Sequence, residues 1–375
     1  MRDYSGALRD LGYGRYFEDS FSSLAEVGDL PARVIEEQRG RYRVVFQPER
    51  GALAEAEALA SPGLLKGSSS ATELPAVGDW VALKSPNRAT RGGPLFIRRV
   101  LPRAGAFIRK TPGEAQHDRI EAQVVAANVD YAFIVAAAGA DWKPRRVERY
   151  VVLARAANAQ PVLVLTKADL AADPGRLLAE AAVAAPAART ALICAPSGLG
   201  LGDLSFALAP GRTTVLIGSS GAGKSTLLNA LAGEALARTG EIRAEDERGR
   251  HTTTSRRLYR LRQGALIIDT PGLRELQLWA DEEEAGAAFP EIEELAALCR
   301  FRDCRHESEP GCAVRAALEA GELDAGRFAG WGKLTKEAAF LRAKEEGSGR
   351  EAERRRWRAI ERSRRSFAKT SRRDH

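Results

Sequence analysis

The sequence has few cysteines and no long apolar run. Four cysteines in a chain of 375 residues are too few to form a disulfide framework. No stretch of about 18 uninterrupted apolar residues offers a membrane span. The first residues, MRDYSGALRD, carry charges where a signal peptide needs an apolar core. We therefore expect a cytoplasmic protein with no membrane partner.

The length and composition favour several globular domains. A chain of 375 residues exceeds what one hydrophobic core usually organises, so we expect two or three domains, each with its own core. The 44% of hydrophobic residues and 29% of charged residues are typical of a soluble globular protein. We find no internal repeat in the sequence.

The small positive charge of the chain is unevenly distributed. The 57 Lys and Arg residues exceed the 50 Asp and Glu residues, for a net charge of +7. Residues 350–375 hold eleven Lys and Arg against four Asp and Glu, so the rest of the chain is nearly neutral. This basic tail could bind a polyanion, and the alternative is a solvated helix end that aids solubility.

Three regions differ in their pattern of apolar residues. Residues 41–110 hold short apolar runs broken by turn-forming segments, which predicts a small β domain. From residue 130 onward, buried-strand runs alternate with Ala-rich and Leu-rich helical stretches, the pattern of a parallel α/β sheet. Beyond Trp279 an acidic segment precedes a Cys/His group and long charged helical sequence, which predicts a small α domain.

A glycine-rich segment lies between a predicted strand and a predicted helix. It has the pattern GxxxxGK[ST] and consists of Gly218, Ser219, Ser220, Gly221, Ala222, Gly223, Lys224, Ser225 and Thr226. Glycines let backbone N–H groups turn inward around phosphate oxygens, in conformations that a Cβ would obstruct. We expect Lys224 to act as a catalytic cation on the β and γ phosphates and Ser225 to bind Mg²⁺. This loop alone does not distinguish ATP from GTP.

A second motif favours guanine as the base. It matches the [NT]KxD pattern of GTPases and consists of Thr166, Lys167, Ala168 and Asp169. The Asp169 carboxylate can accept hydrogen bonds from N1–H and the exocyclic amino group of guanine, a donor pair that adenine lacks. The Lys167 stem can cover the base. Cys194 and Ala195 follow a further strand, where GTPases usually carry Ser-Ala and contact the guanine carbonyl through the backbone.

The remaining nucleotide motifs are switches. Asp269 and Gly272 belong to a DxxG motif, in which the Asp reaches Mg²⁺ through water and the Gly amide meets the γ phosphate. A polar run suited to a mobile switch, or to an ordinary turn, contains His251, Thr252, Thr253 and Thr254. Which threonine closes on Mg²⁺ stays open. Leu273 replaces the usual water-orienting glutamine, so we expect slow hydrolysis completed by His251 or by a partner's group.

The order of these motifs is circularly permuted. Ordinary small GTPases run from the phosphate loop through DxxG to the base-reading motifs. In this chain the base-reading motifs at residues 166 and 194 precede the phosphate loop at 218 and DxxG at 269. The segment after DxxG then leads directly into the Cys/His region, so a change at the switch could be transmitted to that region.

Three of the four cysteines cluster beside a histidine. The spacing Cys299-x₄-Cys304-x-His306-x₅-Cys312 offers three thiolates and one imidazole. That number and type of ligand closes a tetrahedral site for one structural Zn²⁺ and leaves no open position for catalysis. Cys194, by contrast, is expected to pack as a small apolar residue.

The permuted motifs together with the Cys/His spacing resemble the RsgA (YjeQ) family of bacterial small-ribosomal-subunit-dependent GTPases. The resemblance covers most of the chain and implies an N-terminal OB-fold β-barrel, a central α/β P-loop GTPase domain with permuted motifs, and a mainly α zinc-binding domain. We expect an extension at 1–35, the OB-fold at 36–112, the GTPase domain at 113–278, the zinc-binding domain at 279–349 and the tail at 350–375.

The resemblance also implies a function. It predicts a cytoplasmic, monomeric factor that binds the small (30S) ribosomal subunit, including rRNA, late in assembly. This factor hydrolyses GTP to GDP and phosphate faster when bound, and then leaves the mature particle. The family pattern assigns GTP to 166–169 and 218–226, Zn²⁺ to the Cys/His cluster, and catalysis to His251. Thr166 and Cys194 are conservative departures from the usual Asn and Ser.

Two other hypotheses about the function stay open. In the first, the chain is a nucleotide-gated RNA-binding scaffold whose GTP turnover is incidental, which Leu273 favours. In the second, it is an ATP-using P-loop enzyme, which the guanine motif and the absence of an LSGGQ segment disfavour.

Overall fold

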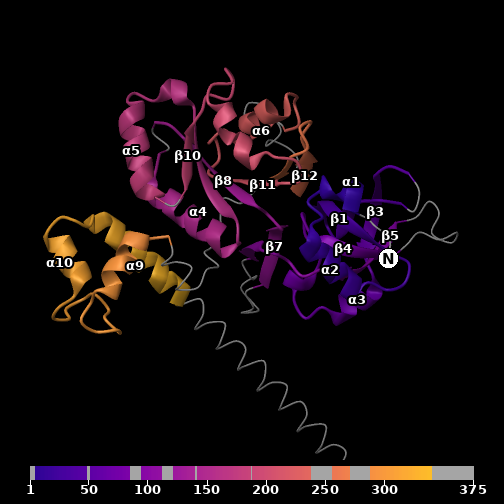
Figure 1. Cartoon of the computed structure of the whole chain (residues 1–375), viewed down its shortest axis with the longest axis horizontal. Helices are drawn as coiled ribbons and strands as arrows, with labels where there is room; N and C mark the ends of the chain where they lie inside the picture. Colours follow the sequence, from indigo (N-terminus) through magenta and orange to yellow (C-terminus); the bar gives the residue numbers. More distant parts are fainter. Residues whose placement is uncertain are drawn as a thin grey trace, which may run out of the picture. The chain divides into compact units, whose positions relative to one another are not determined.

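The structure is a computed structural model with two compact units. They divide between Gln277 and Leu278 (Figure 1). The structure describes residues 5–48, 51–84, 94–111, 121–139, 142–186, 188–237, 256–270 and 288–339. In this part of the chain no helix is both long and apolar enough to cross a membrane.

The first unit opens with two helices and a closed β-barrel. The helices are α1 (Ser5–Arg9) and α2 (Arg15–Leu24). The barrel strands are β1 (Asp29–Gln38), β2 (Arg41–Phe46), β3 (Ala54–Ala60), β4 (Trp80–Lys84) and β5 (Leu95–Val100). They pair in the order β1-β2-β3-β5-β4, and β4 pairs back to β1, which closes the barrel.

Strand β2 shows how the barrel buries one face of a strand and exposes the other. In β2 the side chains of Tyr42 and Val44 are buried, whereas Arg41 and Arg43 are exposed. The inward residues form one apolar core, which includes Val34, Val44, Val81, Leu83 and Ile97. Helix α3 (Pro62–Gly67) follows β3, and the Ser61 hydroxyl caps it by accepting a hydrogen bond from Leu64 N at 3.2 Å. A closed five-stranded barrel with a helix between β3 and β4 is an OB-fold, which the apolar pattern predicts as a small β domain and the family resemblance implies as an OB-fold.

A mainly parallel α/β sheet follows the barrel. Its strands are β8 (Tyr131–Ala137), β9 (Gln160–Thr166), β10 (Arg189–Leu192), β11 (Thr213–Ile217), β12 (Arg256–Arg260) and β13 (Leu266–Asp269). They lie in the order β10-β9-β8-β11-β13-β12, and all pairs are parallel except β12 with β13. The sequences of these strands are runs of apolar residues because parallel strands are buried on both faces. Their core includes Phe133, Val164, Leu216 and Ile267.

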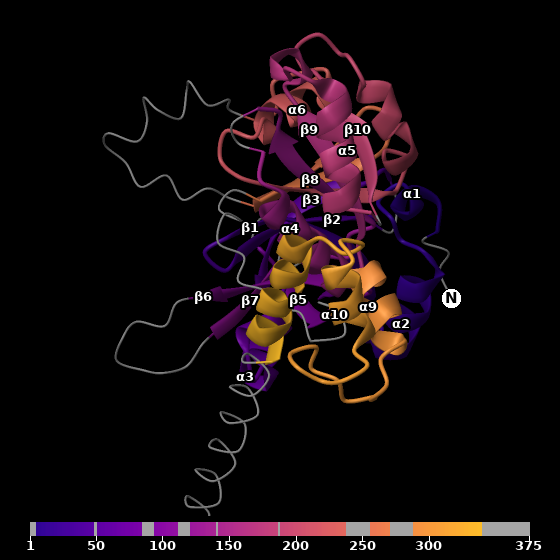
Figure 2. The same cartoon turned by 90° about the vertical axis from the view of Figure 1, so that its left-hand side faces the viewer.

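Helices and turns connect the strands of this sheet. They are α4 (Pro144–Ala156), η3 (Ala168–Leu170), α5 (Pro174–Ala184), η4 (Leu201–Ala207) and α6 (Lys224–Ala232). Helices α4 and α5 pack beside β8, β9 and β10 (Figure 1). A separate antiparallel pair, β6 (Ala106–Thr111) and β7 (Glu121–Ala127), connects the barrel to β8 (Figure 2).

Strand β1 belongs to both the barrel and the α/β sheet. The register of β1 with β2 shifts between Val34 and Glu36, and beyond this shift β1 also pairs with β12. The barrel and the α/β strands therefore form one 11-stranded sheet. The expected domain boundary at residue 36 falls inside this strand, because the barrel requires the β1 residues from Asp29 onward to pair with β4.

A buried arginine ties the barrel to the start of β11. Arg33 is 1% exposed and donates hydrogen bonds to Leu11 O, to Asn128 O at 3.3 Å and to Thr213 Oγ1 at 2.8 Å. Burial lowers the pKa of Arg33 to about 10, which still leaves it charged at neutral pH. The cation thus has hydrogen-bond partners on three segments, and β11 is the strand that leads into the glycine-rich loop.

The second unit is mainly helical. It contains α9 (Pro290–Ala297) and α10 (Ala313–Glu319), turns around the Cys/His residues between them, and a further helical stretch over 325–339. Arg327 pairs with Glu291, donates to Ala288 O at 3.1 Å and lies 4.6 Å from the Phe289 ring centroid. The expected architecture of barrel, permuted α/β domain and mainly α domain is confirmed.

Candidate functional site

The glycine-rich loop connects β11 to α6 and needs its glycines. Gly218, Gly221 and Gly223 have φ angles of +149°, +75° and +92°, which side chains disfavour. A Cβ on Gly218 would lie 2.2 Å from Val135 O, so the neighbouring strand β8 also excludes any larger residue. The loop can therefore turn its N–H groups inward, and α6 begins with Gly223 as its N-cap.

Lys224 lies over this loop. Its Nζ donates hydrogen bonds to Gly218 O at 2.8 Å and to Ser219 O at 2.6 Å. These contacts hold the ammonium at the mouth of the loop, on the first residue of α6. A phosphate seated in the loop would therefore meet backbone N–H groups, the positive end of a helix dipole and a cation.

Thr166 at the end of β9 contacts the glycine-rich loop directly. Its hydroxyl donates to Ala222 O at 2.6 Å, and a Cβ on Gly223 would lie 3.2 Å from Thr166 Oγ1. The sequence assigned Thr166 to the base-reading motif and gave no sign of this contact, because it depends on the pairing of β9 with β8 and of β8 with β11. The base-reading and phosphate-binding motifs are thus joined by a buried hydrogen bond.

The base-reading loop is also joined to the Cys194 segment. Lys167 adopts a left-handed conformation with φ of 57°, and Ala168 N donates to Ile193 O at 3.0 Å. Cys194 N donates to Leu199 O at 3.0 Å, which closes the loop that carries Ala195. Asp169 is exposed at this edge of the sheet. Its carboxylate is accessible to a ligand that approaches the carboxyl ends of the parallel strands.

Asp269 is the last residue of β13 and is 8% exposed. It pairs in register with Leu216 of β11, so the carboxylate lies beside the strand that leads into the glycine-rich loop. Ser225 is the second residue of α6. The other predicted switch residues lie outside the described residues and are His251, Thr252, Thr253, Thr254 and Gly272.

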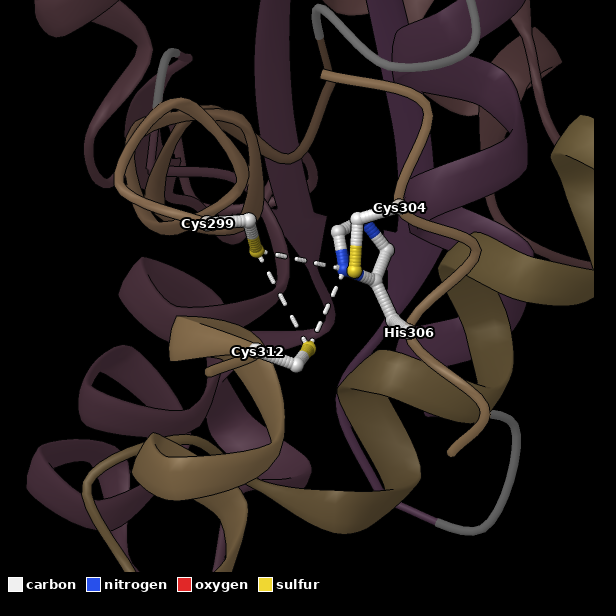
Figure 3. Close-up of side chains that lie close together, drawn as sticks. All are labelled: Cys299, Cys304, His306 and Cys312. Carbon is white, nitrogen blue, oxygen red and sulfur yellow. Dashed lines mark hydrogen bonds between the residues drawn. The ribbon is translucent and has the colours of Figure 1, made fainter. Parts of the chain in front are cut away.

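The Cys/His residues of the second unit form one compact cluster. The ligand atoms of Cys299, Cys304, His306 and Cys312 all lie within 4.8 Å of one another. His306 Nδ1 lies 3.6 Å from Cys299 Sγ and 3.4 Å from Cys312 Sγ, and the two sulfurs are 3.9 Å apart. Figure 3 shows the three sulfurs gathered around the Nδ1 edge of the imidazole. Such a cluster could hold one metal ion.

Burial shifts the pKa values of two of the four cluster side chains, Cys304 and His306. Burial raises the pKa of the Cys304 thiol to about 11, so without a cation the thiol stays protonated at neutral pH. Burial lowers the pKa of His306, which favours the neutral imidazole that binds metals. A divalent cation between these groups would stabilise the thiolates and use the imidazole lone pair.

The loop between His306 and Cys312 has its own anchor. Backbone N–H groups of Arg305, Glu307 and Ser308 donate to the Glu309 carboxylate at 2.9, 2.9 and 3.0 Å. These hydrogen bonds, the one from Arg305 first, lower the pKa of Glu309 to about 2. The carboxylate therefore fixes the turn that presents His306, a role that the sequence alone did not indicate.

The chain matches one protein family throughout. A family model described as RsgA GTPase matches residues 100–279. Over 359 residues the chain is 44% identical to the small ribosomal subunit biogenesis GTPase RsgA of Opitutus terrae, covering 94% of this chain and 95% of that protein. The chain belongs to the RsgA GTPase family. The RsgA protein of Streptomyces coelicolor is 40% identical over 347 residues, covering 92% of this chain and 90% of that protein.

Two solved structures share the fold of this chain. The crystal structure of YjeQ from Thermotoga maritima matches with a TM-score of 0.60 and 25% identity, over 83% of this chain and 99% of that chain. YloQ, described as a circularly permuted GTPase, matches with a TM-score of 0.58 and 24% identity, over 84% of this chain and 96% of that chain, and this likeness shows the fold. The predicted family and enzyme class, a circularly permuted GTP hydrolase, are confirmed.

The contact between Thr166 and the phosphate loop leads to a prediction for this RsgA-family chain. Thr166→Val removes the donor to the buried Ala222 carbonyl, and we expect guanine-nucleotide affinity to fall about tenfold. Thr166→Ser keeps the hydroxyl and should stay close to wild type. Titration with a fluorescent guanine nucleotide measures both. Equal affinities for the Val and Ser variants would show that the contact is unimportant for binding.

Proposed function

We propose that the chain is a GTPase that binds the small (30S) ribosomal subunit and acts late in its maturation, with GTP hydrolysis stimulated by the subunit. The observation that carries this proposal is the 44% identity, over 94% of the chain, to a protein named for small-subunit biogenesis. A match that includes the barrel and the Cys/His unit, as well as the GTPase region, favours a shared role for the whole chain.

The nucleotide proposal rests on the loops at the carboxyl ends of the strands. The phosphate loop with Lys224 would bind the phosphates of GTP or GDP, and Asp169 with the backbone near Ala195 would bind guanine. Ser225 and Asp269 offer a hydroxyl and a carboxylate, the hard oxygen donors that Mg²⁺ prefers. These residues therefore fit a magnesium ion held together with the nucleotide.

The metal proposal rests on the donor set of the second unit. Three sulfurs and one imidazole nitrogen within 4.8 Å fit one structural Zn²⁺. All four positions are filled by protein ligands, so the ion would organise the fold and would not activate water. We propose that it orders a surface that contacts the ribosomal subunit.

RNA contact fits the charge and the barrel. OB-folds commonly present a groove to nucleic acid, and the basic tail at 350–375 supplies side chains for phosphate contacts. We further propose a cytoplasmic monomer in which His251, or a group from the ribosomal subunit, assists the attacking water that Leu273 cannot orient.

The alternative is a nucleotide-gated RNA-binding scaffold in which hydrolysis is incidental. Leu273 is the observation that favours it. The two functions differ in cells that lack the protein. A variant that binds GTP without hydrolysing it would restore subunit assembly if the chain acts as a scaffold.

Steady-state GTP hydrolysis by the zinc-loaded full chain tests the main proposal. Purified small subunits should stimulate the rate roughly tenfold or more, because a partner can complete an unfinished hydrolytic site. Large subunits and free RNA are the partner controls, and Lys224→Ala sets the background rate. Equal rates with and without small subunits would remove the proposed stimulation and favour the scaffold.

A further inference from the structure

Three charged residues lie in one row across three neighbouring strands. Glu36 of β1 is the register partner of Arg257 of β12, and Arg257 is the register partner of Asp269 of β13. Both strand pairs are antiparallel, so directly opposite side chains lie on the same face of the sheet. The row thus runs from the barrel, through a single arginine, to the carboxylate proposed to reach Mg²⁺.

The arginine in this row is paired on its barrel side. Arg257 Nε lies 3.9 Å from Glu36 Oε2, and its guanidinium carbon lies 5.5 Å from the Tyr259 ring centroid. Burial raises the pKa of Tyr259, and the negative charges of Asp269 and Glu36 raise it further, while Arg257 lowers it. Both carboxylates therefore act on the same small region of β12. Opposite residues on adjacent strands are about 5 Å apart at Cβ, which brings either carboxylate within reach of Arg257.

Arg257 and Mg²⁺ carry charges of the same sign and would compete for Asp269. A guanidinium drawn to Asp269 neutralises the carboxylate and repels a divalent ion nearby. A second carboxylate on the barrel side reduces this competition, because it offers the guanidinium another partner. The Glu36 side chain is 20% exposed and the Arg257 side chain is 41% exposed, so solvent weakens this ion pair and the expected effect of losing it is modest.

We propose that Glu36 is a positioning residue that keeps Arg257 paired to the barrel and so preserves the affinity of the nucleotide site for Mg²⁺. The inference deepens and rests on the proposed function, since it assumes that the site binds a magnesium nucleotide. This arrangement also couples the barrel to the nucleotide site. A ligand that moves β1 changes how strongly the Arg257 charge acts on Asp269.

The neighbouring row provides a matched control. Glu37 lies opposite Arg256, with Glu37 Oε2 3.5 Å from Arg256 Nη1, and Arg256 Nη2 donates to Gln123 Oε1 at 3.2 Å. Successive residues of a strand point to opposite faces, so this pair lies on the other face from Glu36 and Arg257. Glu37→Gln therefore removes the same charge from the same strand pair without freeing Arg257.

The experiment measures how the binding of fluorescent GDP to the full-length, zinc-loaded chain depends on Mg²⁺. We expect Glu36→Gln to raise the Mg²⁺ concentration for half-maximal binding enhancement about fivefold, with affinity in EDTA unchanged. Glu37→Gln should stay within about twofold of wild type. Arg257→Gln should need no more Mg²⁺ than wild type, and Glu36→Gln combined with Arg257→Gln should match Arg257→Gln alone.

Several outcomes would overturn the inference. It fails if Glu36→Gln and Glu37→Gln need the same Mg²⁺ concentration, if the double variant stays as weak as Glu36→Gln, or if wild-type affinity does not depend on Mg²⁺. If Glu36→Gln does not fold, Arg257→Gln decides alone, and a higher Mg²⁺ requirement than wild type overturns the proposal. A wild-type chain that binds no guanine nucleotide at any Mg²⁺ concentration would instead refute the proposed function, and this inference with it.

Discussion

Asp169→Asn is expected to weaken GTP binding by about a hundredfold or more and to raise the affinity for xanthosine triphosphate. The aspartate carboxylate accepts from two guanine N–H donors, and both hydrogen bonds are charge-assisted. An asparagine offers one acceptor and places an amino group against a guanine amino group. Xanthine carries a carbonyl oxygen at that position, which can accept from the asparagine amide. Asp169 is exposed and follows β9, so the substitution leaves the core intact.

Competition binding measures this change. Displacement of a fluorescent guanine nucleotide by GTP, ATP and xanthosine triphosphate gives the three affinities for each variant. Asp203→Asn is the matched control, because Asp203 is an exposed aspartate of the same unit in η4. Equal GTP affinity for Asp169→Asn and Asp203→Asn would exclude Asp169 as the base-reading residue. Equal displacement by ATP and GTP in the wild type would favour an ATP-using enzyme.

The sequence predicts the architecture well because each motif has a local context. The glycine-rich loop lies between an apolar run and a helical stretch, and the structure has β11 and α6 at those places. Strand β1 was harder to place. It starts at Asp29, and two residues near its end, Glu36 and Glu37, pair with β12, more than two hundred residues away along the chain. Such pairing depends on long-range register, which a periodic pattern within one segment does not contain.

For the candidate site too, some features can be predicted from local sequence and others cannot. Residue type and spacing predict which side chains carry charge, sulfur or glycine conformations, and the cluster at Cys299 follows from them. The contacts that support these side chains do not follow from residue type and spacing. The hydrogen bond from Thr166 to Ala222, and the row from Glu36 to Asp269, arise only when strands distant in sequence become neighbours. Glu309 supports the metal loop by accepting hydrogen bonds from backbone N–H groups, and a glutamate in a polar segment gives no sequence signal of such contacts.

Loss of the proposed zinc is expected to unfold the second unit while the first unit stays folded. The described part of the second unit, residues 288–339, is short and has a small apolar core that includes Phe289, Ile292 and Val314. A core this small gives only marginal stability, and a structural zinc site contributes about 10 kcal/mol or more. Cys312→Ala removes one ligand and leaves two thiols and an imidazole, which bind zinc far more weakly.

Zinc content and amide hydrogen exchange together test this prediction. Cys312→Ala should lose its zinc and its amide protection over 288–339, whereas protection over the barrel strands, residues 29–46, should match wild type. Cys194→Ala is the matched control, since it removes the fourth cysteine, which lies far along the chain from the cluster, and should keep one zinc per chain. A Cys312→Ala chain that retains zinc and protected amides would mean that the cluster does not hold a structural metal. Because the basic tail belongs to the same unit as the cluster, we also expect Cys312→Ala to weaken binding to small ribosomal subunits, even where nucleotide affinity is unchanged.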